Sequence, residues 1–346
     1  MGREEALAAL RDYDGRSLRI MEVCGTHTAA IMRNGIPSLL SPGIRLVSGP
    51  GCPVCVTPAA YIDRLMELSL APDTCVLTFA DMLRVPGGAG ALQDVRGRGG
   101  QVRAIYSPLE AVELARANPR VTYVAAAVGF ETTAPAFALM LSRARAMNLP
   151  NLRALTALKT MLPPLDMLGA RGKVDAFLCP GHVSVIIGSD AYKPLAAKYR
   201  LPYVVAGFGA EHILAALYAI LRQLEGGRGE VENLYPSAVT PEGNTRAQAL
   251  LAECFEPCDA VWRGIGVIPG SGLRLRGDYR RFDAGGDVCA AHEAESDCRC
   301  GDVILGELLP PGCPLFGMAC TPEHPVGPCM VSAEGSCGIW YSSQAN

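Results

Sequence analysis

The first residues able to do chemistry are a cysteine and a histidine three positions apart, Cys24 and His27, in the motif CGTH. The cysteine follows an apolar run, residues 19–23, and precedes a helical pattern, so we expect it where a strand turns into a helix. Open α/β sheets bind ligands at this position. Helix-terminal N–H groups are expected to lower the pKa of the Cys24 thiol. A thiolate and an imidazole are suitable ligands for iron, so an iron site is one interpretation of the motif. The alternative interpretation is structural: a buried cysteine beside a histidine that caps the helix.

A second pair of thiols, Cys52 and Cys55, forms a C-x-x-C motif within residues 49–58, GPGCPVCVTP. In thioredoxin-type motifs of this kind, helix N–H groups stabilise a thiolate and the two sulfurs can close a disulfide. The same spacing is half of a zinc site, which needs a second matched pair, whereas Cys75 and Cys179 each stand alone. The glycine and proline residues suit an exposed, strained loop, so redox chemistry or iron ligation is favoured over zinc.

Two further segments end predicted strands with polar side chains. GFETT, residues 129–133, carries a carboxylate, Glu131, and PGHVS, residues 180–184, carries His182. Taken singly, they are typical of a helix cap and of a loop histidine. Together with the cysteines they favour a polar cleft between two α/β lobes.

Six cysteines crowd the last fifty residues: Cys298, Cys300, Cys313, Cys320, Cys329 and Cys337. Four of them lie among proline- and glycine-rich loops with the spacing C-x14-C-x6-C-x16-C: Cys298, Cys313, Cys320 and Cys337. Four such thiolates fit a [4Fe-4S] cluster, with the two others as spare or substitute ligands. A structural zinc on four thiolates is the alternative. The distance in sequence from the early cysteines predicts two separate sites.

Composition narrows the class of protein. Of the 346 residues, 49% are hydrophobic and 19% are charged, and the net charge is -3. This composition favours neither a disordered chain nor electrostatic binding to nucleic acid. The sequence has no run of about 18 uncharged apolar residues, so no membrane span is predicted. The N-terminus lacks the basic segment followed by an apolar segment that is typical of a signal peptide. We therefore expect a cytoplasmic protein. Fourteen cysteines are many for that reducing compartment, and metal binding or redox chemistry must explain most of them.

Alternating strand and helix patterns must position these residues, and they predict parallel sheets with helices on both faces. The strand candidates are residues 18–24, 45–49, 75–81, 102–106, 121–130, 174–179 and 202–208. The helix candidates are residues 58–70, 108–119, 134–148, 210–227 and 244–255. One large sheet would fit, but an interruption at MNLPNL favours two Rossmann-like α/β lobes, residues 1–147 and 148–227. Residues 228–346 are then expected to form a small C-terminal iron–sulfur domain.

With both cysteine groups in view, the chain resembles the HypD family of hydrogenase maturation factors over nearly its whole length. The resemblance rests on motifs in a fixed order: CGTH at 24–27, GPGCPVC at 49–55, GFETT at 129–133, PGHVS at 180–184, and CRCGDV through CMVSAEGSC at 298–337. It implies a HypC-type chaperone and a HypE-type cyanide donor as partners. The cargo that it implies is iron carrying two cyanides and one carbon monoxide.

The resemblance also implies roles for single residues. Cys24 and the N-terminal cysteine of the chaperone hold the iron, and His27 shapes that site. Cys52 and Cys55 cycle between dithiol and disulfide, and a [4Fe-4S] cluster passes electrons to them. His182 and Glu334 occupy motif positions assigned to partner docking or proton movement. The cluster ligands are Cys298 or Cys300, with Cys313, Cys320 and Cys337.

One departure and three competing hypotheses accompany the resemblance. Where the family is expected to read GFEP, this chain has GFGA at 207–210 followed by Glu211, so no role is carried onto that carboxylate. An iron–sulfur-linked thiol–disulfide oxidoreductase is the main alternative and predicts that Cys24 is dispensable. A nucleotide-binding enzyme lacks a phosphate motif, since residues 84–100 do not match one. A structural zinc protein is the third.

Overall fold

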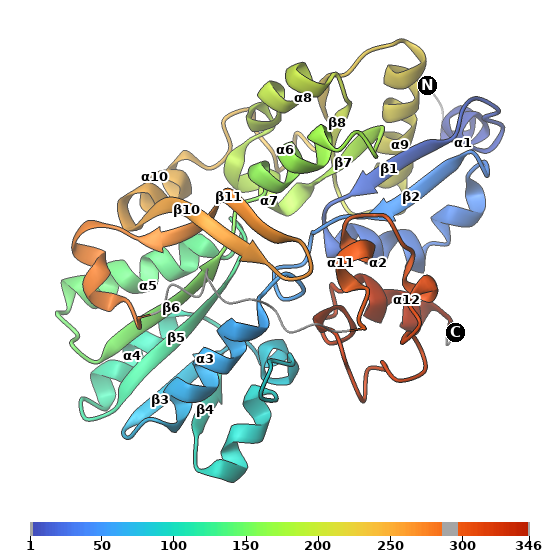
Figure 1. Cartoon of the computed structure of the whole chain (residues 1–346). Helices are drawn as coiled ribbons and strands as arrows, with labels where there is room; N and C mark the ends of the chain where they lie inside the picture. The colour runs from blue at the N-terminus through green and yellow to red at the C-terminus, as the bar shows by residue number, and fades with distance from the viewer. Residues whose placement is uncertain (1–2, 286–296, 345–346) are drawn as a thin grey trace.

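The computed structural model describes residues 3–285 and 297–344, and its architecture is α/β, with two parallel sheets and one antiparallel hairpin (Figure 1). This class agrees with the prediction from the alternating pattern. Within the described residues, no helix is long and apolar enough to cross a membrane.

The first sheet has the strand order β2-β1-β7-β8-β9. Its strands are β1 (Leu18–Glu22), β2 (Ile44–Ser48), β7 (Ala176–Pro180), β8 (Tyr203–Ala206) and β9 (Val231–Asn233). One apolar face packs against α1 (Arg3–Arg11), α2 (Gly25–Arg33) and α9 (Ala210–Glu225). The other face packs against α6 (Leu162–Ala170) and α8 (Lys193–Tyr199). Both faces are buried, as parallel sheets require.

The second sheet has the strand order β4-β3-β5-β6. Its strands are β3 (Thr74–Thr78), β4 (Gln101–Ala104), β5 (Thr122–Gly129) and β6 (Leu152–Leu158). One face packs against α4 (Leu109–Ala117), α5 (Ala134–Ala146) and α10 (Thr245–Cys254), and the other against α3 (Ala59–Leu70). The antiparallel hairpin of β10 (Phe255–Trp262) and β11 (Gly266–Leu275) follows α10.

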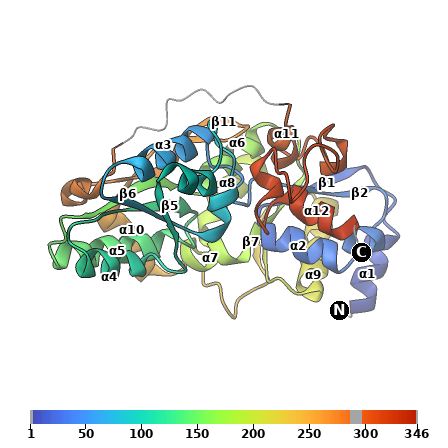
Figure 2. The same ribbon diagram turned by 90° about the horizontal axis from the view of Figure 1, so that it is seen from below.

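The remaining helices are short. They are α7 (Gly181–Ile187), α11 (Cys300–Ile304), α12 (Ser336–Gln344) and the 3-10 helices η1 (Ile36–Leu39), η2 (Ala80–Arg84), η3 (Leu92–Arg98), η4 (Asp190–Tyr192), η5 (Gly277–Phe282), η7 (Pro310–Gly312) and η8 (Pro328–Met330). In two views the C-terminal segment with α11 and α12 lies beside α2 and the edge of the first sheet (Figures 1 and 2).

The two sheets do not coincide with the two predicted lobes, residues 1–147 and 148–227, because each sheet takes its strands from a different division of the chain. β1 and β2 belong to the same sheet as β7, while β6, which follows the expected break, pairs in register with β5. The interruption at Asn148 is the end of a helix, because this residue has a left-handed backbone (φ 49°) that turns the chain directly from α5 into β6. The chain therefore crosses between the sheets more than once.

Candidate thiol and metal centre

Cys24 is the residue before the first turn of α2, two positions after the end of β1. The predicted place at a strand-to-helix turn is therefore confirmed. The side chain is buried, and the GPGC loop is pressed against it: a Cβ atom on Gly51 would lie 2.6 Å from the Cys24 Cα. Only glycine allows the loop to approach this closely.

The expected lowering of the Cys24 pKa is wrong. Burial raises the pKa of the thiol to about 11, and the backbone N–H groups of His27 and Thr26 offset this only in part. The negative charges of Glu334 and Glu22 add to the rise. The rise in pKa caused by desolvation is larger than the fall caused by the N–H groups of the helix terminus, so the thiol carries its proton at neutral pH. Binding of a metal ion would displace that proton.

Glu22 is a buried carboxyl group beside Cys24 that sequence reasoning missed. Its oxygens accept hydrogen bonds from the Cys24 N–H (3.0 Å) and the Thr28 hydroxyl (2.5 Å). Burial raises its pKa to about 8, although these hydrogen bonds and one from Ser48 oppose the rise. A charged residue inside the apolar run that leads to Cys24 was the available signal.

His27 is fully buried, with Nε2 3.1 Å from the Gly207 carbonyl oxygen. Among the described residues its Nδ1 has no hydrogen-bond partner. Burial lowers the pKa of His27 to about 4, so the ring is neutral. The GFGA segment that departs from the family pattern therefore supplies a partner for the site histidine.

The ring of Phe208 lies between two histidines, with centroids 4.8 Å from His27 and 4.1 Å from His182. His182 is exposed at the second position of α7. Sequence reasoning missed Phe208, and the only signal was its position at the carboxyl end of a predicted strand. The structure thus brings His182 to the same end of the first sheet as Cys24 and His27.

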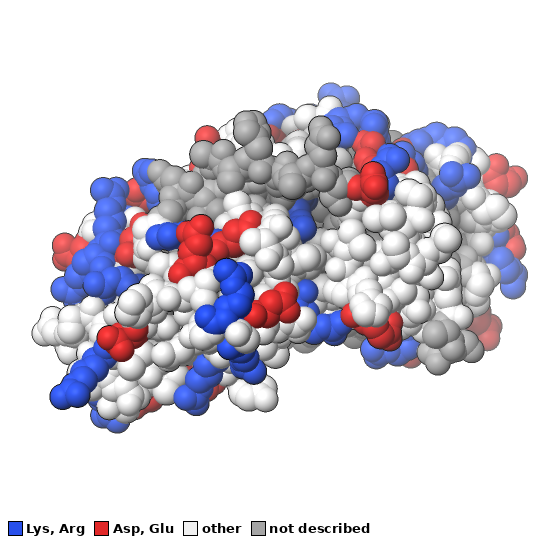
Figure 3. Space-filling view, turned by 60° about the horizontal axis from the view of Figure 1, so that its bottom comes forward, with Lys and Arg blue, Asp and Glu red and all other residues white. Residues whose placement is uncertain are grey.

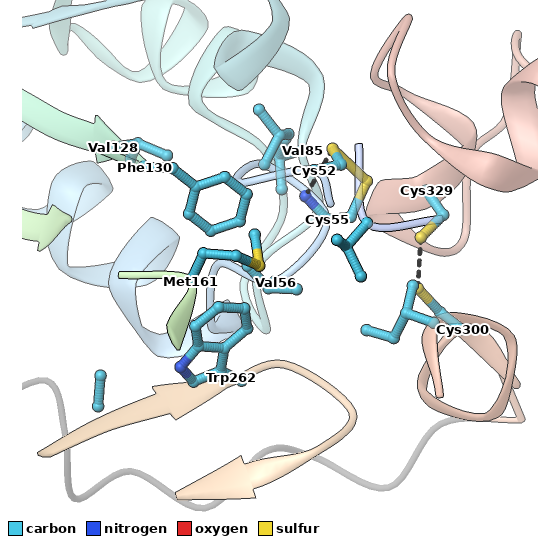
Figure 4. Close-up of a cluster of buried hydrophobic side chains, with 14 of the residues drawn as sticks. Cys52, Cys55, Val56, Val85, Val128, Phe130, Met161, Trp262, Cys300 and Cys329 are labelled. Atoms are coloured by element: carbon cyan, nitrogen blue, oxygen red, sulfur yellow. Dashed lines mark hydrogen bonds between the residues drawn. A yellow bond between two sulfur atoms is a disulfide. The ribbon is translucent and has the colours of Figure 1, made fainter. Parts of the chain in front are cut away.

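Cys52 and Cys55 are joined by a disulfide, as their spacing allows. The expectation of an exposed loop is wrong, because both side chains are buried (4% and 1% exposed). Figure 4 shows the disulfide in an apolar cluster with Phe130, Met161 and Trp262. Bulky valines at positions 54 and 56 draw the loop into this core, so solvent does not reach the sulfurs.

Glu131 is buried next to this cluster. One carboxyl oxygen accepts a hydrogen bond from the Met161 N–H (2.8 Å) at the start of α6, and the other has no partner among the described residues. Burial raises its pKa to about 7. Glu131 thus accepts a hydrogen bond at the N-terminus of a helix, in line with the helix-cap interpretation. The helix is α6, however, and not α5, which follows Glu131 in the sequence.

The six C-terminal cysteines line one small pocket together with Phe316 and Met330. The Sγ atoms of Cys300 and Cys329 are 2.7 Å apart. Burial, followed by the neighbouring Cys300, raises the pKa of Cys298 to about 12. Residues 3–285 and 297–344 contain no group of three or more His, Cys, Asp or Glu placed to hold a single metal ion. A donor set of six thiols around an apolar pocket fits an iron–sulfur cluster.

The C-terminal cysteine segment packs against the turn that carries Cys24. The Thr26 hydroxyl donates a hydrogen bond to Glu334 (3.1 Å), and a Cβ atom on Gly25 would lie 2.7 Å from the Glu334 Cα. Cys52 and Cys55 share one buried cluster with Cys300 and Cys329 (Figure 4). The C-terminal segment therefore closes over the CGTH turn and the disulfide loop.

Fold and site together define a thiol-rich α/β protein in which a pocket of six cysteines lies in the segment that packs on the CGTH turn. The profile of the family HypD, described as "Hydrogenase formation hypA family", matches residues 3–344. A hydrogenase maturation factor HypD of Azotobacter vinelandii is 43% identical over 341 residues, which cover 94% of this chain and 89% of the relative. The factor of the same name from Escherichia coli is 42% identical over 334 residues, again 94% and 89%.

A third relative, the hydrogenase maturation factor HypD of Rhodobacter capsulatus, is 40% identical, and the alignment covers 97% of this chain and 93% of the relative. The chain belongs to the HypD family of hydrogenase maturation factors. The resemblance drawn from the cysteine motifs is thus confirmed.

Proposed function

We propose that this protein is the scaffold on which the Fe(CN)2CO group of nickel–iron hydrogenases is assembled, with a HypC-type chaperone and a HypE-type cyanide donor as partners. The observation that carries the proposal is the position of Cys24. Its thiol lies at a strand-to-helix turn against the disulfide loop, and the C-terminal segment covers the same turn. A soft thiolate shielded from water suits iron with strong-field ligands.

In this proposal the iron is cargo, held by Cys24 and by the N-terminal cysteine of the chaperone. The thiol gives up its proton as the iron binds. His27 stays neutral and is fixed by the Gly207 carbonyl and the Phe208 ring, and its Nδ1, which has no partner among the described residues, can accept a hydrogen bond at the site. Glu22 holds the backbone N–H of Cys24 and orients the residue.

Cys52 and Cys55 provide the electrons or protons for ligand attachment. Closing of the reduced dithiol to the disulfide releases two electrons and two protons, and reopening of the disulfide takes up the same number and restores the two thiols. A [4Fe-4S] cluster bound in the cysteine pocket supplies one-electron redox chemistry. We assign Cys298, Cys313, Cys320 and Cys337 as its ligands. Cys300 is left out because its sulfur already lies 2.7 Å from that of Cys329.

The chaperone docks beside Cys24 in this proposal. A groove between α2 and α12 opens next to the CGTH turn, and it is lined mainly by apolar and small residues, among them Met32, Val331 and Ile339. Residues 308–344 carry two charged side chains, Glu323 and Glu334. Figure 3 shows a broad area without charged residues on this side of the molecule. Interface cores are depleted of charge in the same way.

His182 and Glu334 then border the docking site. His182 is exposed beside Phe208, and Glu334 bonds Thr26 at the edge of the iron site. Both can contact a partner or pass a proton to the site.

Infrared spectroscopy tests the scaffold directly. The tagged protein is purified without oxygen from cells that assemble a nickel–iron hydrogenase. Two variants are purified in the same way: Cys24→Ala and the matched control Cys254→Ala, which changes a buried cysteine of α10 in the core beside the second sheet. Cyanide and carbonyl bands are expected in wild type and control and absent from Cys24→Ala. Wild-type protein without such bands, although its partner co-purifies, would reject the scaffold.

An iron–sulfur-linked thiol–disulfide oxidoreductase is the second candidate. The observation that favours it is the closeness of a disulfide and a thiol pair within one apolar cluster. It predicts that hydrogenase maturation survives Cys24→Ala but not Cys52→Ala.

A further inference from the structure

A small pocket lies between the helix that follows Cys24, the neighbouring strand β2 and the C-terminal segment. The space open to small molecules is about 30 Å³, and roughly 10–15 Å³ is enough for one water molecule. A diatomic molecule therefore fits, whereas a larger ligand does not. Most of the lining is apolar, with side chains from α2, β2, the residue before η7 and α12: Ile31, Met32, Leu46, Val47, Leu309 and Trp340.

Glu22 connects this pocket to Cys24. Its side chain lines the pocket, and its carboxyl group accepts a hydrogen bond from the Cys24 N–H (3.0 Å). The hydroxyl groups of Thr28 and Ser48, which also line the pocket, donate to the same carboxyl group. These polar groups satisfy one another, and a buried water needs about two to four polar partners. The pocket therefore favours an apolar guest over water.

The pocket reaches the surface at its other end. Leu309, which is 47% exposed, and the exposed Pro37 both belong to its lining. The wall that contains Trp340 is complete only when α12 lies against α2, as it does in Figures 1 and 2. A small molecule can thus enter from solvent and come within one side chain of the Cys24 backbone.

Of the ligands in the proposed cargo, carbon monoxide matches the pocket. It is diatomic, uncharged and nearly non-polar, so an apolar pocket costs it little, whereas anionic cyanide would lose its hydration there. In the proposed function a partner donates the cyanide, and no partner supplies the carbon monoxide. The carbon monoxide therefore needs a binding place of its own beside the iron.

We propose that this pocket binds carbon monoxide before it is attached to the iron held by Cys24. The inference rests on the scaffold function proposed above. Attachment is a ligand addition in which carbon donates its electron pair to form the iron–carbon bond. No bond within carbon monoxide breaks, and no proton is transferred. The pocket contributes proximity, because it holds a dilute gas next to the atom that it must reach.

Xenon tests the pocket directly, because this apolar atom occupies dry apolar cavities. Crystals of the purified protein under xenon pressure should show an atom between Leu46 and Trp340. Leu46→Phe, which fills the pocket with a larger side chain, should lose this atom. Leu7→Phe changes another half-buried leucine of the same core, outside the pocket, and should keep it. A wild-type pocket without xenon would overturn the proposal.

Infrared spectra of the protein from cells that assemble a nickel–iron hydrogenase test the use of the pocket. In Leu46→Phe the cyanide bands should persist, while the ratio of carbonyl to cyanide intensity falls by about tenfold, which corresponds to about 1.4 kcal/mol of lost binding. Leu7→Phe should keep the wild-type ratio. Growth under added carbon monoxide should restore the ratio in Leu46→Phe, since a high gas concentration replaces the pocket. Val47→Ile, which adds a single methyl group to the lining, serves if Leu46→Phe does not fold.

The outcomes are distinct. An unchanged ratio in Leu46→Phe, an equal loss of carbonyl and cyanide bands, or a deficit that added carbon monoxide does not repair would each reject the pocket and leave the proposed function untouched. Failure of the proposed function shows elsewhere, as wild-type protein that carries neither kind of band. The inference then falls with the scaffold, even if xenon binds.

Discussion

Thr26 and Glu334 are joined by a hydrogen bond of 3.1 Å across 308 positions of the chain. The bond fastens the last cysteine-rich segment onto the turn that carries Cys24. It is exposed, so its own contribution to stability is small, at most about 0.5–1.5 kcal/mol. Its structural consequence is larger, because it marks the point at which the C-terminal segment packs on the CGTH turn.

Close packing at this junction can be tested through Gly25. An added Cβ would fall 2.7 Å from the Glu334 Cα, so Gly25→Ala must push the C-terminal segment away. We expect a loss of about 1–3 kcal/mol in the free energy of unfolding, the usual cost of overpacking. Urea denaturation measures it, and Gly97→Ala, where an added Cβ meets nothing within 4 Å, should change stability little. Equal losses would show that the junction is not tightly packed.

The buried Glu131 predicts a pH dependence of stability. Burial raises its folded pKa to about 7, above the ordinary value of 4.5, so the folded state binds the proton more tightly than the unfolded chain. Its stabilising contribution is complete below about pH 4.5 and is lost as pH rises through about 7, with a total of about 3 kcal/mol.

Glu131→Gln should remove this pH dependence and keep an acceptor for the Met161 N–H. Free energies of unfolding of wild type and variant, measured between about pH 5 and pH 8, should therefore run together at low pH, where both side chains are neutral, and diverge as pH rises through about 7, where ionisation of the buried wild-type carboxyl costs stability. Glu113→Gln, at an exposed carboxyl paired with Arg116, is the control. Parallel pH profiles for wild type and Glu131→Gln would contradict the prediction.

His27 offers a test that separates packing from chemistry. His27→Phe keeps a ring against Phe208 and leaves the Gly207 carbonyl without its donor, which costs about 1–3 kcal/mol for a buried group. The variant should fold, yet its infrared cyanide and carbonyl bands should be weakened or lost. His212→Phe, at an exposed ring in the first turn of α9 to which no role is assigned, should retain the bands. Full bands in His27→Phe would leave the imidazole with a packing role alone.

The choice of cluster ligands can be tested by serine substitution. Anaerobically purified Cys298→Ser, Cys313→Ser, Cys320→Ser and Cys337→Ser should lose the brown colour and most of the iron. Cys329→Ser should keep both, because its sulfur pairs with Cys300 in our assignment. Iron analysis and visible absorption decide the matter. A colourless Cys300→Ser beside a brown Cys298→Ser would exchange these two residues in the ligand set.

Local patterns in the sequence were enough to place the motifs. Apolar runs that alternate with amphipathic helices predicted seven strands of the two parallel sheets, and with them the place of Cys24 at the end of β1. The period of buried residues is a property of the segment itself, so it can be read without its neighbours. The short strand β9 (VEN) and strand β6 (LRALTAL), in which apolar and polar residues do not alternate regularly, were missed.

The sequence by itself determined the family, the strand-and-helix alternation and which thiols are close in the chain. Only the tertiary structure decided that β1 lies beside β7, that the C-x-x-C disulfide is buried, and that Glu334 reaches Thr26. It also reversed the expected pKa shift of Cys24. The physical reason is that pairing, burial and desolvation depend on segments brought together from distant parts of the chain, and no local pattern encodes them.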